Sequence, residues 1–124
     1  MLEKLKRAWP AWIWLLIITY LSTKGGISVP KFDLLASDKL GHAAAYCLLA
    51  WLMLYGLSRT TPATTGLGLV VLAFAAGYGA LMEYVQFAFF PDRHFEYDDM
   101  LANTLGALIG WLLFARLTHR QSRA

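Results

Sequence analysis

Four long stretches of this chain lack any aspartate, glutamate, lysine or arginine, and no other feature of the sequence constrains the fold as strongly. They cover residues 8–23, 40–58, 60–82 and 100–115. At a rise of about 1.5 Å per residue, an α-helix of this length crosses or nearly crosses a hydrocarbon core about 30 Å thick. Apolar and aromatic residues make up 58% of the chain and charged residues only 15%, outside the usual balance of soluble proteins. The sequence therefore predicts an integral membrane protein.

We expect an all-α bundle of four transmembrane helices, forming a single domain over residues 1–124. The expected helices cover about residues 8–23, 38–58, 64–90 and 98–117, and the segments between them contain glycine or proline. The first helix follows basic residues as in a signal peptide, but no small-residue cleavage site comes before Lys24. We therefore interpret it as a retained helix.

The charged residues predict an orientation and a site. With both termini in the cytoplasm, seven lysines and arginines lie inside and four outside, as the positive-inside rule favours. Of the acidic residues, only Glu3 lies inside, whereas seven lie on the opposite side. Acidic residues contribute little to membrane topology, so this asymmetry needs another reason, and it indicates a functional site at the outer surface.

Composition also excludes several classes of function. The formal net charge is +3, but the basic residues form short clusters between apolar blocks, which predicts membrane lipids as partners and no nucleic acid. Cys47 is the only cysteine, so an intramolecular disulfide and a thiolate metal site are both excluded. Glycine and alanine faces on the helices leave homo-oligomer formation open.

Polar residues recur at helical spacing near the expected outer ends of two helices. Asp38 and His42 are four residues apart, and Glu83 and Gln86 are three apart, so each pair shares a helix face. A carboxylate inside a membrane helix costs roughly 2.5–3.5 kcal/mol on insertion scales, so Glu83 needs a partner. Arg93, in the loop directly after this helix, is the nearest candidate.

The last helix begins with Asp98 and Asp99, and Asp99, Asn103, Gly106 and Gly110 follow one stripe along it. Gly106 and Gly110 form a small-xxx-small pattern that lets another helix approach closely. Taken singly, Asp38 or Asp98 is more typical of an N-cap, and Asn103 of an interhelical hydrogen bond. The convergence of several helix ends favours a binding site made of Asp38, His42, Glu83, Gln86, Arg93, Asp98, Asp99 and Asn103.

These motifs resemble those of the VanZ-like membrane proteins. The matching residues are the segment from Asp38 to His42, then Tyr46, Glu83, Gln86 and Arg93, and the block 98–110. The family is named after an accessory protein of glycopeptide resistance, so the resemblance implies a role in the bacterial cell envelope, a location in the cytoplasmic (inner) membrane and a possible link to antibiotic resistance. The loop His94 to Tyr97 is bulkier than the small, polar residues of many members.

Three functions remain open on the sequence alone. In the first, the polar residues bind a phosphate- or amine-bearing envelope component, such as a lipid-linked precursor or a glycopeptide, without chemistry. In the second, Glu83, Asp99 and His42 are catalytic residues of a small enzyme that acts on a lipid phosphate or pyrophosphate, with or without a divalent cation. In the third, the polar residues only hold the bundle together or mediate assembly.

Overall fold

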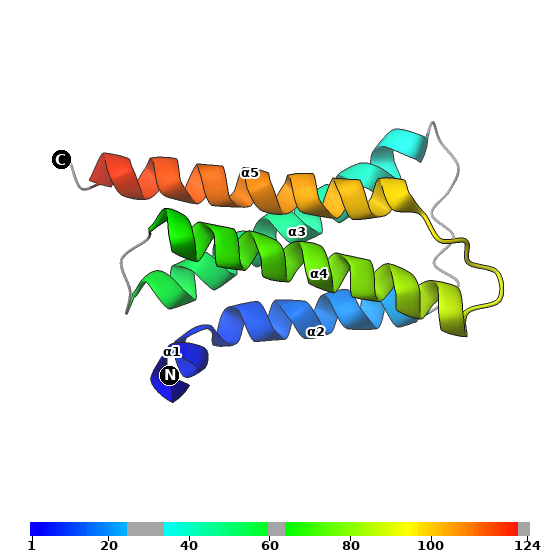
Figure 1. The fold of residues 1–124 in the computed structure, drawn as a ribbon, viewed down its shortest axis with the longest axis horizontal. Coiled ribbons are helices and arrows are strands. Elements are labelled where there is room, and N and C mark those ends of the chain that lie inside the picture. The colour runs from blue at the N-terminus through cyan, green and yellow to red at the C-terminus, as the bar shows by residue number, and fades with distance from the viewer. Residues whose placement is uncertain (25–33, 60–63, 122–124) are drawn as a thin grey trace.

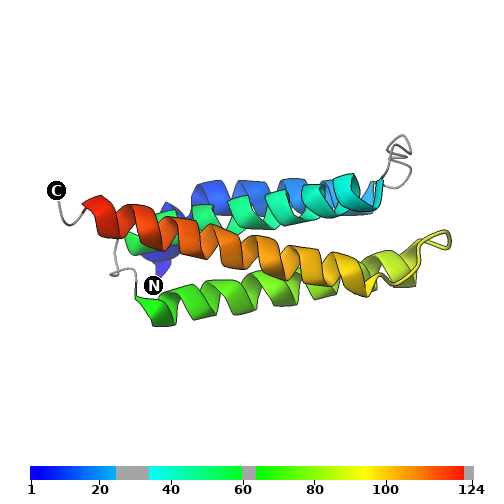
Figure 2. The same cartoon turned by 90° about the horizontal axis from the view of Figure 1, so that it is seen from above.

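The computed structural model describes residues 1–24, 34–59 and 64–121, without the side chains of residues 34–38. These residues form an antiparallel helical bundle with both chain ends at one end of it (Figures 1 and 2). The helices are α1 (Leu2–Arg7), α2 (Trp9–Thr23), α3 (Leu34–Ser58), α4 (Thr65–Phe89) and α5 (Tyr97–Gln121). The all-α prediction is confirmed for the described residues.

Local sequence explains where several helices begin and end. Pro10 lies in the first turn of α2, where its missing N–H is tolerated, and the chain bends at Ala8 just before it. The Thr64 side chain accepts the Leu67 N–H at 3.2 Å and caps α4, which ends two residues before Pro91. Helix α3 begins four residues before the expected start, because Leu34, Leu35 and Ala36 are good helix formers. Asp38 therefore lies in the second turn of α3.

Three helices are long and apolar enough to cross a membrane: Lys39–Ser58, Thr65–Phe89 and Tyr97–Gln121. About a third or less of each span is buried inside the bundle, so most of its apolar surface faces outward, as expected of helices surrounded by lipid. Helix α2 has 15 residues and a length of about 22 Å, short of the hydrocarbon core. The chain is thus a membrane helical bundle of three long spans and one shorter apolar helix, and its orientation stays a prediction.

Helices α3 and α5 pack against each other more extensively than any other pair in the described chain. A Cβ atom at Gly106 would overlap the backbone of Ala43, and one at Gly110 would overlap the backbone of Cys47. The prediction that these glycines admit a neighbouring helix is confirmed, and α3 is that helix. The core beside this contact consists mainly of Tyr46, Leu49, Ala50, Val71, Ala75, Ala107 and Phe114.

Because α3 backbone leaves no room beside Gly106, we expect Gly106→Ala to lower the free energy of unfolding by about 1–3 kcal/mol, the usual range for overpacking. Unfolding in mixed detergent micelles, followed by circular dichroism, measures the change. Gly77→Ala is the matched control, since a Cβ there meets nothing within 4 Å. Equal stability of the two variants would show that the close helix contact is unimportant.

Candidate functional site

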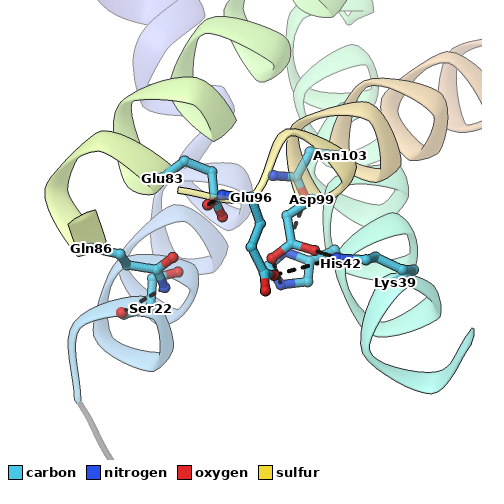
Figure 3. A network of polar contacts seen from close by, with 8 residues as sticks. All are labelled: Ser22, Lys39, His42, Glu83, Gln86, Glu96, Asp99 and Asn103. Atoms are coloured by element: carbon cyan, nitrogen blue, oxygen red, sulfur yellow. Dashed lines mark hydrogen bonds and ion pairs between the residues drawn. The ribbon is translucent and has the colours of Figure 1, made fainter. Parts of the chain in front are cut away.

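Polar side chains from α3, α4, α5 and the loop before α5 gather at the end of the bundle that lies away from the chain termini (Figures 1 and 3). We call this group the polar cluster. Four of its members are almost completely buried, although each has a charged or strongly polar side chain: Glu83, Gln86, Asp99 and Asn103. The cluster consists of Lys39, His42, Glu83, Gln86, Glu96, Asp99 and Asn103.

Asp99 lies at the centre of the polar cluster, with 2% of its surface exposed. Its carboxylate forms an ion pair with Lys39 and lies 3.4 Å from His42, measured from Oδ2 to Nε2. Both partners come from α3, where they are three residues apart and share a face. Asp99 also belongs to the first turn of α5, where the helix dipole favours negative charge.

His42 contacts a second oxygen on α5. Its Nδ1 lies 3.1 Å from Oδ1 of Asn103, a side chain that is 2% exposed. Gly79 of α4 makes room for that amide, because a Cβ at this position would lie 2.9 Å from Nδ2 of Asn103. Both ring nitrogens of His42 therefore face oxygen atoms, and only a doubly protonated imidazole donates to both. His42 thus joins α3 to two oxygen-bearing side chains of α5.

Glu83 is bound by the backbone of the loop between α4 and α5. Its Oε2 accepts the N–H of Glu96 at 3.3 Å, and 2% of its surface is exposed. Among the described residues no ion pair joins it to Arg93, the partner that the sequence suggested. A turn in which the Arg93 N–H donates to the Phe90 carbonyl leaves the Arg93 side chain exposed.

Glu96 connects the loop to α3 as well, since its Oε2 lies 3.4 Å from Nζ of Lys39. Half of the Glu96 side chain is exposed, against 3% for Asp99. The pKa of Glu96 lies below its ordinary value of 4.5, because the side chain shares a hydrogen bond with Asp99 and lies beside the Lys39 ammonium. Glu96 is therefore the accessible carboxylate of the cluster.

Gln86 joins α2 to the cluster. Its Nε2 donates to the backbone carbonyl of Ser22 at 2.9 Å, and Figure 3 shows the two residues on facing helices. Every buried polar side-chain atom in the described chain has a hydrogen-bond partner. The polar cluster thus links the four helices through satisfied contacts.

The structure brings together five of the eight residues suggested by the sequence: His42, Glu83, Gln86, Asp99 and Asn103. Arg93 and Asp98 lie at the same end but are exposed, and the side chain of Asp38 is outside the described residues. Sequence reasoning missed Lys39 and Glu96. The spacing of Lys39 and His42 was an available signal, because residues three apart share a helix face.

No group of three or more histidine, cysteine or acidic side chains is arranged to hold a metal ion among the described residues. The cation that contacts Asp99 and Glu96 is the Lys39 ammonium. What the arrangement offers is an imidazole placed between two oxygen atoms, a positive charge on Lys39 and one accessible carboxylate at the edge.

A family model described as VanZ/LLP1 matches residues 4–118, nearly the whole chain. The match confirms the resemblance that the sequence motifs indicated. None of the curated proteins or solved structures compared with the chain matches it significantly.

The Lys39–Asp99 pair should behave as a coupled unit. Lys39→Met removes the positive charge that pairs with the buried carboxylate of Asp99. We therefore expect a loss of up to about 3 kcal/mol in the free energy of unfolding. Adding Asp99→Asn should restore part of that loss, because the uncompensated charge is then removed. A double-mutant cycle of unfolding in detergent measures the coupling. Additive effects of the two substitutions would contradict a direct interaction.

The ionised Glu96 should stabilise the fold above pH 4.5, and this contribution should disappear as the pH falls through its lower, folded-state pKa. The neutral variant Glu96→Gln removes this titration. We therefore expect its free energy of unfolding to fall less steeply than that of the wild type as the pH drops below 4.5. Equal slopes in the two proteins would contradict the contact with Lys39.

Proposed function

The chain belongs to the VanZ/LLP1 family of membrane proteins, and from this membership and the polar cluster we propose that it binds a component of the bacterial cell envelope. The ligand carries a phosphate or an amine, as lipid-linked precursors and glycopeptides do. It binds where the polar cluster meets the outer surface of the cytoplasmic membrane. Binding alone, without a chemical step, is the function that needs the fewest special features of the site.

The observation that carries the proposal is the burial of Asp99 and Glu83 within membrane-spanning helices, each 2% exposed. Insertion scales give a cost of roughly 2.5–3.5 kcal/mol for such a group, whereas an interhelical hydrogen bond in a membrane averages about 0.6 kcal/mol. Hydrogen bonds between helices therefore do not offset the cost of inserting two buried acids. Ionisable residues inside a membrane protein are more typical of a ligand or proton site.

The edge of the cluster supplies groups that a ligand can exchange. In the Lys39–Glu96 contact of 3.4 Å the Glu96 side chain is half exposed, and exposed pairs contribute little to stability. A ligand phosphate can therefore replace Glu96 beside Lys39. Arg93, exposed in the same loop, offers a second cation with a geometry suited to phosphate. Once Glu96 has left Lys39, an amine on the ligand would pair with the Glu96 carboxylate.

The contact of His42 with Asp99 favours a second function, that of a small enzyme acting on a lipid phosphate or pyrophosphate. A histidine oriented by a carboxylate is a common general acid or base. His42 would move the proton, and Lys39 would stabilise negative charge on the phosphate. Glu83 and Asp99 are the other catalytic candidates from the sequence. Asp99 would orient His42, and Glu83 would act from its place beside them in the cluster.

Native mass spectrometry of the protein released from mild detergent tests the binding proposal. We expect the wild type to retain a specific lipid or glycolipid mass and Arg93→Ala to reduce its retention about tenfold, as for loss of a charge-assisted hydrogen bond. The comparison follows only masses other than those of ordinary bilayer phospholipids. For these masses Arg59→Ala, which removes an exposed arginine at the opposite end of the bundle, is the matched control.

Bare wild-type protein, or equal retention by both arginine variants, would overturn the binding proposal and favour a role in holding the bundle together. Conversion of the retained mass to a dephosphorylated product by the wild type, but not by His42→Ala, would instead establish the enzyme. Circular dichroism shows whether each variant is folded.

A further inference from the structure

The end of the bundle opposite the polar cluster carries the reverse charge. Among the described residues it has six lysines and arginines and a single acid, Glu3. All six basic side chains are exposed. We call this region the basic end; its cations are Lys4, Lys6, Arg7, Arg59, Arg116 and Arg120.

The short helix α1 combines this charge with apolar side chains. Leu2 and Leu5 lie three residues apart on α1 and are 74% and 42% exposed, and Trp9, the first residue of α2, is 62% exposed. Lys4, Lys6 and Arg7 are interleaved with them. A helix that exposes large apolar groups among basic ones is typical of a segment lying in the interface of a membrane, with its apolar groups among the acyl chains.

The direction of α1 is fixed by contacts with the rest of the bundle. It turns away from the axis of α2 at Ala8 (Figure 1). Ala8 is 1% exposed and packs closely on Gly56 of α3. A Cβ added at Gly56 would lie only 2.6 Å from the Cα of Ala8. The Trp12 indole donates to the Leu5 carbonyl at 2.9 Å. The bend therefore holds α1 across the end of the bundle.

A hollow on α5 marks the same end of the molecule. The hollow is open and shallow, because all of its lining residues belong to α5, and Ile109, Leu112, Leu113 and Ala115 form its apolar part. Arg116, Thr118 and His119 line the rest. An apolar surface that runs to a cationic and hydrogen-bonding end matches the order of groups in a phospholipid, with the acyl chain beside the leucines and the phosphate at Arg116.

From the charge, the fixed position of α1 and this hollow, we propose that the basic end binds anionic phospholipids of the surrounding bilayer in preference to zwitterionic ones. Each exposed cation near a membrane surface attracts anionic headgroups, and salt screens the attraction. The Lys6–Glu3 pair does not prevent this, because both side chains are about 70% exposed and such pairs are weak. The proposal is independent of any ligand at the polar cluster.

Competition between phosphatidylglycerol and phosphatidylcholine in mixed detergent micelles, with the full chain and native mass spectrometry, tests this. We expect the wild type to retain phosphatidylglycerol in excess, and Lys6→Gln with Arg7→Gln to lower that excess about fivefold per removed cation. The charge-conserving pair Lys6→Arg with Arg7→Lys should retain it. Lys24→Gln, at the opposite end, should leave it unchanged.

Equal retention of the two lipids by the wild type would overturn the proposal. So would a loss in Lys24→Gln as large as that in the double glutamine variant, since the preference would then not belong to the basic end. The thermal unfolding temperature of each variant shows whether its fold has changed. Added salt should lower the preference of the wild type, and an unaffected preference would also count against it.

Discussion

The pairing of Asp99 with Lys39 and His42 determines how the rest of the bundle is arranged. A carboxylate that is 2% exposed needs compensating charge and hydrogen bonds, and both partners lie on α3. They reach Asp99 only if α3 and α5 approach closely. Gly106 and Gly110 permit that approach, because neither places a side chain against the backbone of α3. Close packing and charge pairing therefore depend on each other.

Much of this arrangement was predictable because helices impose a simple geometry. Charge-free stretches gave the long helices, and spacings of three and four placed His42, Glu83, Asp99 and Asn103 at one end. What sequence could not supply were contacts made by the backbone. The Glu96 N–H that binds Glu83 and the Ser22 carbonyl that binds Gln86 belong to atoms that every residue carries, so no pattern identifies them. Arg93, by contrast, had the expected chemistry, but a turn directs it outward.

The two ends of the bundle differ in how they use charge. Around the polar cluster, acidic and basic groups of three helices and one loop lie close together, and every buried polar side-chain atom in the described chain has a hydrogen-bond partner. At the basic end, the cations are exposed and surrounded by apolar side chains. The first arrangement holds charge where solvent screens it little, so each contact within it is stronger than the same contact in water. The second exposes its charge at the surface of the bundle.

The separation of Lys39 and Asp99 along the chain has a consequence for biogenesis. The two residues are 60 positions apart, so α3 leaves the ribosome well before α5 has been made. During that interval the Lys39 ammonium has no Asp99 to pair with, and it must remain among lipid headgroups or water at the membrane surface. The arrival of α5 then supplies the carboxylate with which the lysine pairs. The contact between α3 and α5 is therefore made only after both helices have been synthesised.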